Sequence, residues 1–150
     1  MAAIDYAGIK VAMKALFDGD ATLQAIRETF TDVEAELLIS PERTPWIGIY
    51  GESRDVDHEP LASGRRLFYR YLITVRVSAY DPENLAAAAK LRDDIIGQAE
   101  IVLLQNRTLS GTVTTLRLEG GEMMSGQVPE DLGFLADGVI EVRTVVSMVG

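Results

Sequence analysis

The stretch LFYRYLITVRVSAYDPENLAAAAKLRDDIIGQAEIVLLQN, residues 67–106, decides the fold because it contains two different periodicities in succession. In its first part, apolar side chains occupy every second position. They are Leu67, Tyr69, Tyr71, Ile73, Val75, Val77 and Ala79. The positions between them are mixed and basic. Because a strand points successive side chains to opposite faces, this pattern predicts a long strand with one apolar face.

After residue 84 the spacing changes to that of an amphipathic helix. Apolar positions recur at intervals of three and four and form one stripe, which a single charge, Arg92, interrupts. The stripe consists of Leu85, Ala88, Arg92, Ile95, Ile96, Ala99, Val102 and Leu103. Between strand and helix, Asp81 is the expected N-cap and Pro82 is expected near the first helical turn.

The N-terminal part predicts two further helices that must pack on the sheet. The first covers residues 4–17 and ends at the breaker cluster Asp18-Gly19-Asp20. The second is short, covers residues 21–29, and has Asp20 as its N-cap. Residues 33–39 alternate and suit a short strand or an extended connector, and Pro41 and Pro45 bracket a turn.

Three more strands are expected, at residues 46–50, 112–119 and 139–149. Residues 120–133 are expected to form a loop with Met123 and Met124 exposed or facing a partner. The sum is one α+β domain over residues 1–150. It is a two-layer sandwich in which a roughly four-stranded, mostly antiparallel sheet carries helices on one face.

Residues 51–66, GESRDVDHEPLASGRR, show no apolar periodicity and are rich in charge. They lie between two strands that we expect to pair. Unstructured loops of this length are uncommon inside compact domains and are often functional. We therefore predict a long surface excursion, which an extended hairpin reaching beyond the domain body would explain.

Composition and charge exclude several classes of function. The chain has 150 residues, no cysteine and a net charge of −9. Disulfides, thiolate metal sites and a cysteine nucleophile are therefore excluded, and the charge argues against binding nucleic acid by neutralising phosphates. No apolar run approaches the length of a membrane helix, and the first residues do not resemble a secretory signal.

The search for catalytic residues centres on His58, the only histidine. With Asp55, Asp57 and Glu59 it forms a D-x-D-H-E run that could contact a metal ion. The run lies in the least periodic segment, and no second ligand cluster accompanies it. G-x-S-x-G and glycine-rich phosphate motifs are absent. We expect no catalytic, cofactor or metal site, with a small metal-dependent hydrolase centred on His58 as the alternative.

The second face of the long strand is the more informative surface. Its polar side chains are interrupted by large ones, which suits either a solvated sheet face or a subunit interface. The candidate interface residues are Arg70, Leu72, Thr74, Arg76, Glu141 and Arg143. The residues of a candidate intersubunit arm are Arg54, Asp55, Asp57, His58, Arg65 and Arg66.

Several segments in this order resemble one known family. They are PWIGIY (45–50), the charged excursion, the strand and D-P-E-N-L-A-A-A-A-K-L-R-D-D-I-I helix, NRTLSGTV (106–113) and DGVIEVRTVV (137–146). Together they resemble the tail terminator, or tail completion, proteins of long-tailed bacteriophages. The resemblance covers residues 4–149 and depends on the order of elements, because the family has no catalytic signature.

The resemblance implies a structural protein of the virion, located at the tail end or neck and assembled in the host cytoplasm. Such subunits form homo-hexameric rings that cap the tail-tube protein, end tail polymerisation and offer the surface that a head-completion or neck protein joins. DNA passes through the channel without specific binding, and no membrane is involved. Another neck or minor tail ring protein, such as a head-closure protein, is the nearest alternative.

Overall fold

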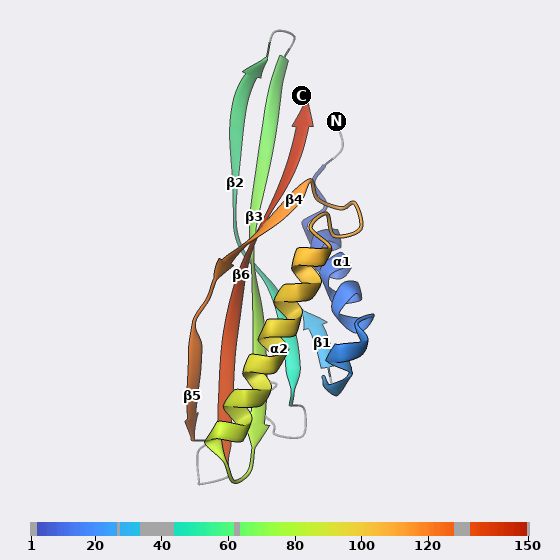
Figure 1. Ribbon diagram of the computed structural model, residues 1–150. Coiled ribbons are helices and arrows are strands. Elements are labelled where there is room, and N and C mark those ends of the chain that lie inside the picture. The colour runs from blue at the N-terminus through green and yellow to red at the C-terminus, as the bar shows by residue number, and fades with distance from the viewer. Residues whose placement is uncertain (1–2, 27, 34–43, 62–63, 128–132, 150) are drawn as a thin grey trace.

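The computed structural model describes residues 3–26, 28–33, 44–61, 64–127 and 133–149. Helices cover one face of a mixed sheet, which confirms the predicted α+β class (Figure 1). The sheet order is β1-β2-β3-β6-β4, and β5 also pairs with β6. The described residues therefore form six strands rather than about four. The elements are α1 (Tyr6–Asp18), η1 (Ala21–Ala25), β1 (Glu28–Thr31), β2 (Trp46–Leu61), β3 (Gly64–Asp81), α2 (Leu85–Gln105), β4 (Thr115–Gly120), β5 (Met123–Gln127) and β6 (Phe134–Val149).

The two periodic segments fold as their spacing predicts. In β3, the side chains of Ile73, Val75 and Val77 are completely buried under the helices. In α2, every member of the predicted stripe is buried except Leu85, which is 37% exposed. The helix packs against β3 and β6, and its apolar stripe meets the apolar face of β3 in one core.

The cap of α2 differs from the prediction. Asn84, not Asp81, is the N-cap, and its Oδ1 accepts hydrogen bonds from the backbone N–H groups of Ala86 and Ala87. Asp81 instead accepts from the N–H groups of Glu83 and Asn84, so that it stabilises the turn before the helix. Pro82 therefore lies in this turn and not in the first helical turn. An Asx residue directly before the first helical residue has the shorter path to those donors.

The N-terminal region is partly as predicted. Asp5 caps α1, and Asp20 caps η1 as expected. The second helix, however, is a 3-10 turn that ends at Ala25, and Glu28–Thr31 forms β1, which pairs in parallel with Trp46–Ile49. The prediction of a helix through residue 29 is wrong because Thr and Phe side chains favour an extended edge strand here. The segment predicted at 33–39 lies outside the described residues except for Val33, as does Pro41.

Residues 51–66 are the largest correction. They are not a loop, because β2 and β3 run through them as an antiparallel hairpin up to the pair Leu61↔Gly64. The pairing of the flanking strands and the extended hairpin are confirmed. The absence of an apolar period misled the loop prediction, because neither α1 nor α2 covers this part of the sheet and neither face is required to be uniformly apolar.

The C-terminal strands also differ in extent. β4 begins at Thr115, after a turn at residues 106–114, and β6 begins at Phe134 rather than at residue 139. The predicted loop at 120–133 contains β5, which pairs with the first residues of β6. Met123 and Met124 are exposed as expected, at 56% and 52%. Gly121 permits the connection, because a Cβ there would lie 1.7 Å from the carbonyl oxygen of Val139.

Arg92, the charge within the helical stripe, is buried and connects three elements. Its Nη1 donates hydrogen bonds to the carbonyl oxygens of Met124 in β5 (3.0 Å) and Asp137 in β6 (3.3 Å). Its Nε donates to Asp93 at 2.9 Å. Gly138 makes room for this side chain, since a Cβ there would lie 3.2 Å from the Arg92 Cδ. The arginine therefore holds the edge strand β5 against α2.

We predict that Arg92→Met destabilises β5 more than the rest of the sheet. The apolar stem is kept, but two carbonyl groups lose a donor, which costs about 1–3 kcal/mol. Hydrogen exchange should show faster exchange at the amides of residues 123–127 and little change in β3. Arg117→Met, at a side chain that is 76% exposed, is the matched control and should leave both strands unchanged.

We predict that Ile95→Asp prevents folding. Ile95 is 4% exposed within the core, and an unpaired carboxylate there costs several kcal/mol, a large part of the stability of a domain this size. Circular dichroism and thermal melting would detect the loss. Ile101→Asp, on the exposed face of the same helix, should fold normally. A stable Ile95→Asp variant would show that the helix buries a different face.

Candidate interaction surface

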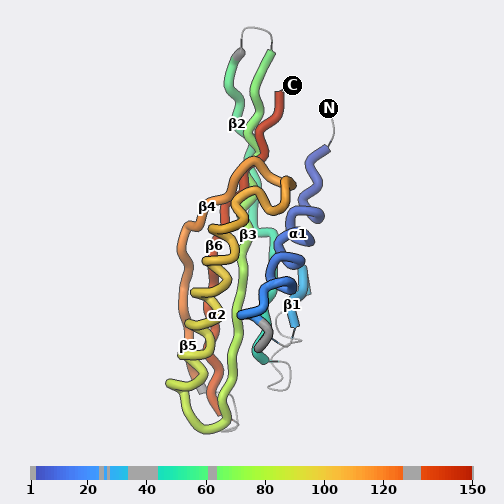
Figure 2. Tube along the Cα trace, turned by 45° about the vertical axis from the view of Figure 1, so that its right-hand side comes forward, coloured from blue at the N-terminus to red at the C-terminus, as the bar shows by residue number. Residues whose placement is uncertain are grey.

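The hairpin projects beyond the helices as an arm, which we define as residues 53–61 of β2 and 64–72 of β3 (Figures 1 and 2). The C-terminal end of β6 runs beside it as a third strand, as far as the pair Arg66↔Val149. A bulge between Gly51 and Ser53 marks the base of the arm. Gly51 is required there, because a Cβ would lie 1.9 Å from the Tyr71 hydroxyl.

The outer face of the arm, which faces away from the side of the sheet that the helices cover, carries paired charges. Arg70 donates to Asp55 at 3.4 Å and to Asp57 at 3.2 Å, and the hydrogen bond to Asp57 is the main reason that its pKa is raised. Arg66 lies 4.0 Å from Glu59. These cross-strand pairs lie on one face because their residues share a parity and a register.

The ion pairs continue across the sheet to its far edge. Arg143 of β6 lies 4.0 Å from Asp55 and donates to Glu119 of β4 at 3.1 Å. Glu119 also lies 3.7 Å from Arg117. Strands β2, β3, β6 and β4 are therefore joined by one chain of alternating charges on the outer face. Of the predicted interface residues, Arg70 and Arg143 belong to this chain.

The remaining predicted interface residues share the outer face nearer the body. Thr74 donates to Glu52 at 2.7 Å, and Arg76 pairs with Asp137 at 2.5 Å while its guanidinium lies 5.7 Å from the centre of the Trp46 ring. A shallow hollow of about 490 Å³ opens here. Its lining residues are Tyr50, Gly51, Glu52, Thr74, Arg76, Met124 and Val139.

Sequence reasoning missed the aromatic part of this face. Phe30 and Trp46 pack with ring centroids 5.3 Å apart and are both buried, although they lie on the side of the sheet opposite α1 and α2. Trp46 shares a row with Ser78, which is why Ser78 is 1% exposed rather than solvated. The prediction needed the register of Trp46 against β3, and the sequence of one strand alone does not show that register.

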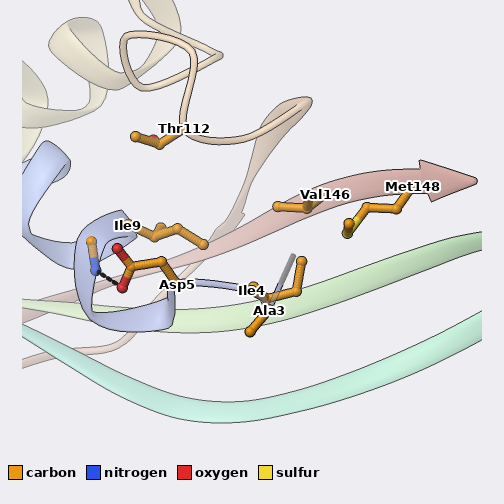
Figure 3. A pocket seen from close by; sticks show the side chains of 8 residues that line it. Ala3, Ile4, Asp5, Ile9, Thr112, Val146 and Met148 are labelled. Carbon is orange, nitrogen blue, oxygen red and sulfur yellow. Dashed lines mark hydrogen bonds between the residues drawn. The ribbon is translucent and has the colours of Figure 1, made fainter. Parts of the chain in front are cut away.

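The face of the arm on the side of the helices has a different character. Two rows across the three strands carry apolar or aromatic side chains in β3 and β6: Val56-Tyr69-Val146 and His58-Leu67-Met148. Val146 and Met148 also line an apolar hollow of about 340 Å³ beside the start of α1, with Ile4, Ile9 and Thr112 (Figure 3). The apolar face of β3 and β6 that packs against the helices in the core thus continues past the start of α1.

The D-x-D-H-E run does not converge on one point. Because the residues of a strand alternate, Asp55, Asp57 and Glu59 lie on the outer face, and His58 lies on the other face opposite Leu67. Asp55 and Asp57 are paired with Arg70. Within the described residues, no group of three or more His, Cys, Asp or Glu side chains could hold a metal ion. The described part of the chain also contains no helix that is both long and apolar enough to span a membrane.

Comparisons with known proteins found a likeness to solved structures and no family. No family model matches the chain, and no curated protein matches it. Among solved structures, the chain is similar to a chain in the virion of a native gene transfer agent particle, with a TM-score of 0.32 and 16% sequence identity. The match covers 94% of this chain and 99% of that chain.

We predict that Arg70→Gln loosens the arm without unfolding the body. Arg70 is the cation between Asp55 and Asp57, and its loss leaves two carboxylates close together on an exposed strand. Hydrogen exchange of residues 54–59 should become faster, while that of α2 stays the same. In the wild-type protein 1 M salt should have the same effect, because exposed pairs are screened. Equal arm exchange in wild type and variant, at low salt, would contradict this role.

Proposed function

We propose that the protein is a structural subunit of a virion and acts as a tail terminator. Copies assemble into a hexameric ring that caps the tail tube, ends tail polymerisation and offers the surface that a head-completion or neck protein joins. The subunits assemble in the host cytoplasm and remain at the tail end or neck of the virion. The chain has no catalytic role in this proposal and binds no cofactor.

The observation that carries the proposal is the arm. It extends a three-stranded sheet beyond the layer of helices, and in the sequence it occupies the place of the long excursion that the tail terminator resemblance includes. Beyond Tyr71, which is buried against Tyr6 at the base, no described helix covers either face of the arm. A ring supplies such cover from neighbouring copies, since cyclic assemblies use two different surfaces of each subunit.

The electrostatics suit a channel for DNA. The net charge of −9 gives little attraction for phosphates, and the arginines on the outer face of the arm are paired with carboxylates of the same face. A wall with few free cations lets a polyanion pass without being held. A ring at another level of the neck, such as a head-closure protein, would have the same electrostatic requirement. Electron cryomicroscopy of the virion distinguishes a subunit at the end of the tail tube from one elsewhere in the neck.

We predict that shortening the arm abolishes ring assembly and leaves the subunit folded. Residues 57–68 can be replaced by Asn-Gly, because Val56 and Tyr69 form a register pair that a two-residue turn can join. The melting temperature should change little, since the helix-covered core lies below this pair. Light scattering after size-exclusion chromatography, alone and with tail-tube protein, should show a monomer.

The same measurement tests the proposed function itself. The wild-type protein should form a ring of six copies under at least one of these conditions. If it remains a monomer at every concentration and with tail-tube protein, the proposal of a tail terminator fails. If the shortened variant forms rings as well as the wild type, the arm has another role.

A further inference from the structure

The two faces of the arm differ in charge as well as in polarity. All acidic residues of the arm lie on the outer face, because Asp55, Asp57 and Glu59 share one parity of β2. On the face towards the helices the charged residues are Arg54 and Arg65, with His58 beside them. Neither arginine has an ion pair with a described residue. In a chain of net charge −9, this face is therefore apolar and locally basic.

The same chain exposes a surface of the opposite kind on α2. Ile101 and Leu104 are 47% and 49% exposed, and their spacing of three places them together on the solvent face of the helix. Asp94 lies about two turns before Ile101 on this face, where it pairs with Lys90 at 2.6 Å, and Glu100 flanks the apolar pair without an ion pair to a described residue. This face of α2, with two carboxylates against one lysine beside the apolar pair, thus complements the basic and apolar face of the arm.

The twist of the sheet turns the arm relative to the part of the sheet that α2 covers. In both views β2 lies on one side of β3 at the foot of the sheet and on the other side in the arm (Figures 1 and 2). The helix-side face of the arm is therefore turned away from the direction in which the same face meets α2. The exposed face of α2 points away from the sheet, so one subunit cannot bring the two surfaces together.

We propose that the helix-side face of the arm of one copy docks on the exposed face of α2 of the next copy. Val56, Leu67 and Tyr69 would cover Ile101 and Leu104, while Arg54 and Arg65 would face Asp94 and Glu100. The contact joins two different surfaces of the subunit, which is the arrangement that repeats around a ring. The inference deepens the proposed ring and rests on it.

The test reverses charge on one surface and then on the other. Arg54→Glu with Arg65→Glu should weaken assembly at least about tenfold in concentration, because like charges then meet across the contact. Asp94→Lys with Glu100→Lys should weaken it similarly. The variant with all four changes should recover most of the assembly. Sedimentation velocity over a concentration series measures each midpoint, and circular dichroism confirms that each exposed substitution leaves the fold intact.

A matched control uses the other face of the same hairpin. Arg66→Glu makes the same change of charge one residue from Arg65, but on the outer face beside Glu59. It should change the assembly midpoint much less than the double reversal at Arg54 and Arg65. An equal loss from Arg66→Glu, or failure of the four-fold variant to recover, would overturn the docking of the arm on α2.

A second measurement uses the absence of cysteine in the chain. Val56→Cys with Ile101→Cys, treated with a flexible thiol crosslinker, should give a ladder of covalent oligomers on a denaturing gel. Asp57→Cys with Ile101→Cys, on the outer face, should not. A ring that forms normally but gives no ladder from the first pair contradicts this contact while leaving the tail terminator proposal intact. A wild-type protein that never assembles contradicts both this contact and the tail terminator proposal.

Discussion

The constraint on which the structure depends is the strict alternation of side chains along β3. This strand pairs with β2 on one side and with β6 on the other over almost its whole length. The apolar parity buries Ile73, Val75 and Val77 under α1 and α2. Because register fixes which residues of β2 and β6 share each row, one parity in one strand determines the composition of both faces of three strands. A slip by one residue would place Arg70 and Arg76 in the core.

The segments that could be predicted from the sequence are those where one face is uniformly buried. The core part of β3, the stripe of α2 and the middle of β6 all show this, because burial selects apolar side chains at a fixed period. The arm could be predicted only as an excursion, since one of its faces carries ion pairs and the other mixes apolar and basic side chains. Neither face is uniformly apolar. The acids at residues 55, 57 and 59 have the period of a strand, but the period is carried by charge. The short edge strands β1 and β5 have too few residues to show any period.

Part of the candidate surface could also be predicted from the sequence, because strand alternation shows which residues share a face. The parity of β3 and β6 correctly placed Arg70, Thr74, Arg76, Glu141 and Arg143 on one face, because alternation is a local property. Their partners come from other elements: Asp55 and Asp57 from β2, Glu119 from β4, and Asp137 from the unexpected beginning of β6. Such contacts depend on register and on strand order, neither of which a single sequence displays. Trp46 was missed as a neighbour of Arg76 for this reason.

The requirements of the fold account for one face of the arm and not for the other. On the outer face, each of the three carboxylates of the arm has an arginine from the neighbouring strand, so the charges stabilise the hairpin that carries them. On the other face, Arg54 and Arg65 form no ion pair with a described carboxylate, and no described helix covers Val56 and Leu67. Folding alone would permit any soluble side chains at these positions. A partly exposed apolar strip beside two cations, in an acidic chain, instead suits the binding of a protein surface that is acidic and apolar.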